Sequence, residues 1–226
     1  MCGIYTLATP DPSQIRARFP IGESLGLRRR FNVAPGDDVL AVVGGDAEPS
    51  GTLLRWGLVP FWASDPRELG VTTINARAET VAERPAYRDA FARRRCLVVA
   101  DGFYEWSGGD PHWITRADGE LFAFAGLWAS WRPRKAGADV EPLHSCTIVT
   151  TAAEGPVRDL HDRMPVILSP SDEAVWLDPA TPAEDLHELL ATAHPSLVVR
   201  PVSRAVNDAR HDEPDCLDPP EQGALF

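Results

Sequence analysis

The second residue of the chain, in the opening run "MCGIY", is a cysteine that could carry chemistry at the chain's own amino terminus. An initiator methionine is normally removed when a small residue follows it, so we expect the mature chain to begin with Cys2. This end would hold an α-amine and a thiol on neighbouring carbons. The α-amine has a reference pKa of about 7.7–8.0, against about 10.4 for lysine, so near neutrality far more of it is uncharged and nucleophilic.

Two kinds of chemistry can use such an end. In the first, the thiolate attacks a side-chain amide with the α-amine as base, as in class II glutamine amidotransferases, many of which begin "MCGI". Those enzymes build their oxyanion hole with an Asn-Gly pair, and this chain contains none. In the second, the amine forms a Schiff base with an aldehyde and the sulfur closes a thiazolidine ring. A thiol reference pKa of about 8.5 leaves roughly a few per cent of thiolate for that closure.

The elements that must position this terminus are mostly β-strands. Apolar runs bounded by turn residues predict strands over 38–43, 52–59, 96–101, 103–106, 112–115, 121–129, 143–151, 165–168 and 196–199. Cap residues and helical spacing predict helices over 11–19, 84–95, 169–177 and 181–193. Because strands and helices do not alternate, the order favours an α+β fold with a largely antiparallel sheet. We expect one domain over residues 1–215 and a tail over 216–226.

The composition is that of an ordinary globular protein. Of 226 residues, 44% are hydrophobic and 24% are charged, and the longest apolar stretches are too short to cross a bilayer. The start lacks the basic and apolar regions of a signal peptide, so we expect a cytoplasmic protein, and we expect a monomer. The cysteines are far apart, so their spacing indicates neither a zinc site nor a redox dithiol, and we expect no metal and no cofactor. They are Cys2, Cys96, Cys146 and Cys216, of which Cys96 and Cys146 lie in strand-like runs typical of buried residues.

The net charge is −11, but the positive charge is concentrated in the first part of the chain. Residues 1–100 contain 13 arginines against 11 acidic residues, whereas residues 101–226 contain 9 basic against 22 acidic residues. Of the 22 basic residues 21 are arginine, whose planar fork suits phosphate. This distribution has two interpretations, a basic groove for nucleic acid and a bias in base composition.

Seven ordered blocks of sequence resemble one known family along nearly the whole chain. They are "MCG", "RFNVAPG", "WGLVPFW", "INARAET", "CLVVADGFYEW", "TAAEGPVRDLHDRMPVIL" and "PVSRAVND". The family is SRAP, the SOS-response-associated peptidase or abasic-site processing proteins. Its members bind single-stranded DNA and trap the ring-opened aldehyde of an abasic site as a thiazolidine on the N-terminal cysteine. The resemblance implies a distorted antiparallel β-barrel flanked by a few helices, Cys2 as the covalent residue, and a nucleoid-associated protein.

The resemblance also assigns three partners to Cys2. Asn75 in "INARAET" matches the family's site asparagine, whose amide can donate to the sugar oxygen and accept from the amine. Glu105 in "GFYEW" lies between aromatic residues, where partial desolvation would raise its pKa and suit it to proton transfer. His161 in "LHDRMP" matches the histidine that assists sugar opening and the Schiff-base step. The family name also leaves open an autoproteolytic peptidase that removes Met1, beside the amidohydrolase alternative.

Further residues are predicted to contact DNA. Arg77 would share a strand face with Asn75 and could hold a phosphate, with Arg84 and Arg163 as secondary candidates. Phe61 and Trp62 could stack on a base beside the lesion. Two more residues are grouped with them because they shape the loop beneath the site, namely Asn32 and Pro35. Two tryptophans, Trp56 and Trp106, are assigned to the core.

Two positions stand apart from these assignments. Ile4 takes the place of an arginine that many family members carry there, which removes one positive contact to DNA. The chain ends in "QGALF", which resembles the short peptide that docks bacterial proteins to the replicative sliding clamp, through Gln222, Leu225 and Phe226. A frayed tail is the alternative interpretation of that segment.

Overall fold

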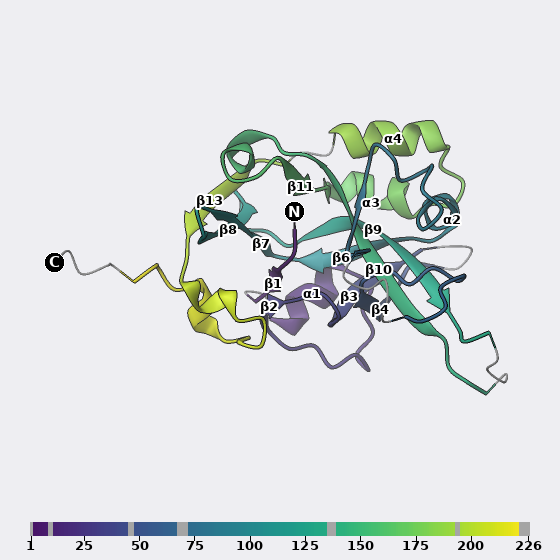
Figure 1. Ribbon diagram of the computed structural model, residues 1–226, viewed down its shortest axis with the longest axis horizontal. Coiled ribbons are helices and arrows are strands. Elements are labelled where there is room, and N and C mark those ends of the chain that lie inside the picture. Colours follow the sequence, from purple (N-terminus) through teal and green to yellow (C-terminus); the bar gives the residue numbers. More distant parts are fainter. Residues whose placement is uncertain are drawn as a thin grey trace.

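Five strands close into a barrel in the computed structural model, which describes residues 2–8, 11–44, 48–66, 72–134, 139–192 and 195–221 (Figure 1). Each barrel strand pairs with two neighbours, in the order β10-β4-β3-β6-β9 and back to β10. All these pairings are antiparallel except the parallel one between β4 and β10. The barrel strands are β3 (Asp38–Val43), β4 (Ser50–Trp56), β6 (Arg95–Ala100), β9 (Phe122–Trp131) and β10 (Leu143–Ala152).

A second, fully antiparallel sheet carries the amino terminus. Its strand order is β13-β8-β7-β1-β2, so β1 lies between β7 and β2. The strands are β1 (Tyr5–Leu7), β2 (Arg30–Val33), β7 (Gly102–Ser107), β8 (Asp110–Arg116) and β13 (Leu197–Pro201). Three short strands extend the barrel sheet, since β5 (Asn75–Arg77) and β11 (Arg163–Pro165) pair with β10, and β12 (Ile167–Leu168) pairs with β9.

Four α-helices and three 3-10 helices complete the described elements. The first helix begins with a capping box, in which the Asp11 carboxylate accepts from the backbone N–H of Ser13 and the Gln14 side chain accepts from the N–H of Asp11. The α-helices are α1 (Pro12–Arg18), α2 (Arg88–Arg93), α3 (Pro170–Leu177) and α4 (Ala183–Thr192), and the 3-10 helices are η1 (Gly155–Asp159), η2 (Arg204–Asn207) and η3 (Pro214–Leu217). No helix among the described residues is long and apolar enough to cross a bilayer.

Strands β3, β6 and β9 of the barrel are buried on both faces because alternate residues enter two different cores. Along β6, Cys96 and Val98 pack into an inner core that includes residues of all five barrel strands, whereas Leu97 and Val99 pack into an outer core. Helices cover the outer core with Ile15, Phe91, Trp176 and Leu186. This burial on two sides explains why the strand appears in the sequence as the continuous apolar run "CLVVA".

Residues 206–218, which we call the C-terminal clamp, are fixed against β2 by buried polar contacts. The side chain of Asn32 is fully buried, and its Nδ2 donates at 3.1, 3.0 and 2.9 Å to the carbonyl oxygens of Val206, Asp208 and His211. One side-chain amide therefore binds three backbone carbonyls of the clamp and ties the clamp to β2.

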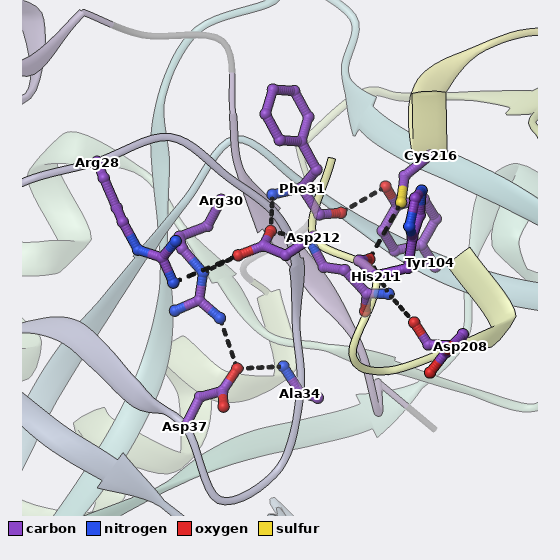
Figure 2. A network of polar contacts seen from close by, with 11 residues as sticks. Arg28, Arg30, Phe31, Ala34, Asp37, Tyr104, Asp208, His211, Asp212 and Cys216 are labelled. Carbon is purple, nitrogen blue, oxygen red and sulfur yellow. Dashed lines mark hydrogen bonds and ion pairs between the residues drawn. The ribbon is translucent and has the colours of Figure 1, made fainter. Parts of the chain in front are cut away.

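Asp212 provides the second attachment of the clamp (Figure 2). Its carboxylate accepts from the backbone N–H groups of Phe31 and Asn32 at 2.6 and 2.9 Å and from the guanidinium of Arg30. Because β2 pairs with β1, the clamp supports the sheet that carries the amino terminus. The sequence places the end of the domain at residue 215, whereas contacts to the domain continue to Asp218, whose carbonyl accepts from the N–H of Ser203.

The structure confirms the predicted α+β class and the barrel. The segments predicted as strands within the barrel are strands, although the run at 165–168 is divided between β11 and β12, and the helix predicted over 84–95 is confined to Arg88–Arg93. Three strands were missed, and all of them have only three or four residues: β1, β2 and β5. Such segments are too short for an alternation of apolar and polar residues to show.

Candidate active site at the amino terminus

Cys2 is held by the start of β1, in the interior of the protein. The N–H of Tyr104 donates to the carbonyl of Ile4 at 3.0 Å, and Tyr5 lies opposite Phe103 in the neighbouring β7. Cys2 itself is fully buried and belongs to the inner core. A two-sided ladder through β1 therefore fixes the position of a residue that stands almost at the end of the chain.

The environment of Cys2 disfavours the thiolate. Burial raises the pKa of the thiol above its usual range, and the negative charge of Glu105 raises it further, while the charge of the amino terminus, here that of Met1, opposes them. The fraction of thiolate is therefore smaller than the few per cent that the reference pKa gives. A sulfur nucleophile at this position must lose its proton during the reaction rather than before it.

Asn75 joins Cys2 through its side-chain amide. Nδ2 of Asn75 donates to the carbonyl oxygen of Cys2 at 2.8 Å. The asparagine begins β5, which pairs with β10. The hydroxyl of Tyr87 donates to the backbone carbonyl oxygen of Asn75 at 3.1 Å. Its Oδ1 is buried and has no hydrogen-bond partner among the residues that the structure describes. Because the Nδ2 and the backbone of Asn75 are both held by hydrogen bonds, Oδ1 is an acceptor in a fixed position.

Glu105 lies in β7, next to the start of β1. Because Tyr5 lies opposite Phe103, the same register places Glu105 opposite residue 3. The side chain is 3% exposed. Burial raises the pKa of its carboxyl, as the sequence analysis expected, while the positive charges of the amino terminus and of His161 lower it. A raised pKa lets this carboxyl hold a proton closer to neutrality than an exposed glutamate can.

His161 follows η1 and is partly exposed, with 34% of its side chain accessible. Its Nδ1 accepts from the backbone N–H of Arg163 at 2.9 Å, which leaves the proton of a neutral ring on Nε2. The same Nδ1 is 2.8 Å from Asp162 Oδ1, a contact that becomes a hydrogen bond only when Nδ1 carries a proton. The ring therefore has a partner in both protonation states, which suits a group that gives and takes a proton.

The structure thus brings together the four residues predicted to act at the site, from four separate segments. Asn75 binds Cys2 directly, Glu105 acts on the pKa of the Cys2 thiol, and His161 acts on the pKa of Glu105. A buried thiol, a carboxyl with a raised pKa and an imidazole can together transfer protons around a carbonyl carbon. The roles of these residues stay predictions.

The three arginines predicted to contact DNA differ in their surroundings. Arg77 and Arg84 are exposed, and Arg77 lies two residues beyond Asn75 with the buried Ala76 between them. The guanidinium of Arg163 donates to both carboxylate oxygens of Glu79 and, at 2.6 Å, to the carbonyl of Thr150. Two arginines are therefore open to a phosphate, and the third is held by a neighbouring loop.

The predicted aromatic and loop residues also divide into exposed and buried groups. Phe61 and Trp62 are 61% and 40% exposed. Trp56 is fully buried, as expected, and Trp106 is partly buried with its indole N–H donating to Asn207 Oδ1 at 2.8 Å. The two loop residues differ, because Pro35 is exposed in a turn whereas Asn32 is interior and holds the C-terminal clamp. That burial makes Asn32 a structural residue in this fold.

Two residues beside the site were missed by the sequence analysis. Tyr87 fixes the backbone of Asn75, and Glu79 holds Arg163 by two hydrogen bonds, yet neither has a local sequence signal, because the contacts form only in the folded chain. Ile4 packs against a small core that includes Phe31 and Tyr104. The residues predicted to dock to the replicative sliding clamp lie outside the described residues, and they are Gln222, Leu225 and Phe226.

A single α+β domain with a cysteine near the amino terminus, set among Asn75, Glu105 and His161, defines the class of the protein. The family model described as SOS response associated peptidase (SRAP) matches residues 1–209, and the chain belongs to this family. It is 37% identical over 230 residues to the abasic site processing protein YoaM of Bacillus subtilis, covering 96% of this chain and 98% of YoaM. It is also 37% identical to the abasic site processing protein HMCES of Gallus gallus, covering 79% of this chain and 61% of HMCES.

Solved structures agree with the fold. A crystal structure of a protein from Bacteroides thetaiotaomicron superimposes with a TM-score of 0.81, covering 96% of this chain and 99% of that one, and its 22% identity shows the fold alone. A second, from Bordetella bronchiseptica, has a TM-score of 0.74 and 29% identity, and covers 89% of this chain and all of that one.

Proposed function

We propose that this protein, after loss of Met1, captures the ring-opened aldehyde of an abasic site in single-stranded DNA as a thiazolidine on Cys2. The observation that carries the proposal is the hydrogen bond from Asn75 to the carbonyl of Cys2, with Glu105 close enough to raise the pKa of the Cys2 thiol and His161 close enough to lower the pKa of Glu105. The names of the relatives, which are abasic site processing proteins, support the same substrate.

The first step is attack of the α-amine of Cys2 on the aldehyde carbon. Because Nδ2 of Asn75 binds the carbonyl of Cys2, the buried Oδ1 is available to accept from the amine and orient its lone pair. The carbinolamine that forms must lose its hydroxyl as water to become the imine. A protonated Glu105 can supply the proton for that departure, because burial favours its neutral form.

The second step is ring closure by the thiol. The sulfur bonds to the imine carbon while the S–H proton leaves, and the imine nitrogen gains a proton, so the whole sequence releases one molecule of water. The neutral Cys2 thiol requires a base at this point, and Glu105 is in its anionic form after the first step. His161 supplies a second proton-transfer group, toward the opening sugar.

The exposed residues that the sequence predicted to contact DNA suit a single strand. Arg77 and Arg84 offer charge to phosphates, and the exposed Phe61 and Trp62 offer faces for base stacking, a contact that does not depend on sequence. Within this proposal the aldehyde enters from the side of Arg77, which follows Asn75 on the same strand.

The amidohydrolase alternative receives less support. A cysteine that attacks an amide works as the thiolate, which is favoured where the environment lowers the thiol pKa. Here burial raises the pKa of Cys2, and the sequence has no Asn-Gly pair for an oxyanion hole. A neutral thiol suits aldehyde capture, in which the amine reacts first.

Intact mass spectrometry of the protein mixed with an abasic single strand tests the proposal. We expect a covalent product whose mass is the sum of the two reactants less one water. A strand with a tetrahydrofuran analogue, which has no aldehyde, is the matched control and should give no product. Turnover of glutamine without a DNA adduct would instead support the amidohydrolase.

A further inference from the structure

The C-terminal clamp brings together three side chains that can bind a metal and that the proposed function does not use. A ring nitrogen of His211, a carboxylate oxygen of Asp215 and the Sγ of Cys216 all lie within 4.8 Å of one another. We propose that these three residues form a binding site for a divalent transition-metal ion of the zinc type. The sequence predicts no metal site, because its cysteines form no closely spaced pair, whereas this site uses a single cysteine.

The folded chain sets the three donors from two adjoining segments. Asp215 and Cys216 belong to η3, and His211 lies in the loop before η3. The backbone carbonyl of His211 accepts from Asn32 at 2.9 Å. Figure 2 shows the sulfur of Cys216 beside the backbone of His211, where the thiol donates to the carbonyl of His211 at 3.4 Å. The clamp therefore fixes the backbone of the donors before any metal arrives.

The site is open to solvent on one side and closed on the other. Cys216 is fully buried, whereas 36% of the His211 side chain and 52% of the Asp215 side chain are exposed. A hollow of about 520 Å³ opens over the exposed pair, and it is lined also by Asp208, Asn207 and Arg204. A water molecule can therefore complete the coordination from this hollow.

The donor types select the kind of metal. Imidazole, carboxylate and thiolate together suit zinc, whereas magnesium and calcium prefer oxygen alone. In the structure Nε2 of His211 and Oδ1 of Asp215 are 2.6 Å apart, which is a hydrogen bond. Tetrahedral zinc bonds of about 2.0–2.3 Å separate ligand atoms by about 3.3–3.8 Å, so these two must part by about 1 Å. On binding, the Cys216 thiol releases its proton to solvent and the sulfur bonds to the metal.

The expected role of the metal is structural. Its ligands cross-link η3 to the loop that holds Asn32, so a bound ion would stabilise the clamp without touching Cys2, Glu105 or His161.

Cobalt titration of the metal-free full-length protein tests the site. The Cys2→Ala variant serves as the background, because it removes the other thiol that lies near a terminus. We expect one equivalent of Co²⁺ to give a thiolate-to-cobalt charge-transfer band with tetrahedral visible bands, and Zn²⁺ to displace them. In this background Cys216→Ser should abolish the charge-transfer band, and His211→Gln and Asp215→Asn should weaken Zn²⁺ binding at least tenfold.

Matched controls are His112→Gln and Asp218→Asn, which change the same residue types outside the cluster and should bind as the background does. Zn²⁺ should also raise the melting temperature of the background protein but not that of the Cys216→Ser variant, and melting without metal shows whether each variant folds. The proposal is overturned if no charge-transfer band forms, if the band persists in Cys216→Ser, or if His211→Gln binds Zn²⁺ as tightly as the background protein.

Discussion

At the residue scale, the buried thiol of Cys2 determines the order of the proposed chemical steps. Burial and the charge of Glu105 both raise its pKa, so the sulfur is not the first nucleophile. The amine then reacts first, and ring closure waits for a base that appears only after the imine has formed. The same carboxyl, Glu105, can serve in both steps because it changes protonation state between them.

The pH dependence of crosslinking should show this role of Glu105. The rate should fall at acid pH as the amine becomes protonated, and at alkaline pH as Glu105, whose pKa burial raises, loses the proton that the first step needs. In Glu105→Gln the alkaline fall should disappear, and the rate near neutrality should drop about 100-fold. Single-turnover rates across the pH range measure both effects. A variant that keeps both limbs and the full rate would contradict this assignment.

Asn75→Ala should slow the capture without weakening the binding of DNA. The variant removes the hydrogen bond to the Cys2 carbonyl and the acceptor for the amine, so the rate should fall about 10- to 100-fold through loss of orientation. Asn207→Ala, which removes a surface amide bonded to Trp106, is the control and should react normally. An unchanged rate in Asn75→Ala would show that the asparagine only supports the backbone.

At the scale of the elements, sequence patterns predicted the barrel better than the strands of the site. The run "CLVVAD" identifies β6 because both faces of that strand are buried. By contrast, β1 and β5 have three residues each and show no pattern. Strand β1 follows Cys2 closely in the chain, and β5 begins with Asn75. Family motifs indicated Asn75, Glu105 and His161, whereas Tyr87 and Glu79 could not be predicted, because their partners lie 12 and 84 residues away.

The interior position of Asn32 was unpredictable for the same reason. It lies in the motif "FNVAPG" beside a turn, but its three carbonyl partners are 174 to 179 residues further along the chain. A family motif indicates that a residue has a role. It does not indicate whether the side chain binds a ligand or another part of the same chain.

Asn32→Ala should lower the free energy of unfolding by about 3 kcal/mol, because the carbonyls of Val206, Asp208 and His211 lose the hydrogen bonds from the buried Asn32 amide. Urea denaturation measures the change. Arg210→Ala, at a side chain that is 94% exposed in the same clamp, is the control and should change stability by less than about 0.5 kcal/mol. A loss below about 1 kcal/mol in Asn32→Ala would mean that the clamp is held mainly by Asp212.

At the scale of the whole molecule, the uneven charge should appear in the salt dependence of DNA binding. The net charge of −11 opposes DNA, so under the proposed function binding relies on the exposed arginines Arg77 and Arg84. Arg77→Ala and Arg84→Ala should each reduce the slope of log affinity against log salt by about 0.7, the value for one phosphate contact on a single strand. Arg210→Ala, in the acidic clamp, should leave the slope unchanged. Equal slopes for all three variants would remove Arg77 and Arg84 from the DNA-binding surface.

The most direct test of the account is whether the adduct at Cys2 needs both amine and sulfur. Abasic single-stranded DNA is mixed with the processed protein and with Cys2→Ser, each with and without borohydride, and the intact masses are measured. The account predicts a stable adduct of the wild type without reductant, and an adduct of Cys2→Ser only when borohydride traps the imine. An equally abundant, reductant-independent adduct of Cys2→Ser, or of a protein that retains Met1, would contradict it.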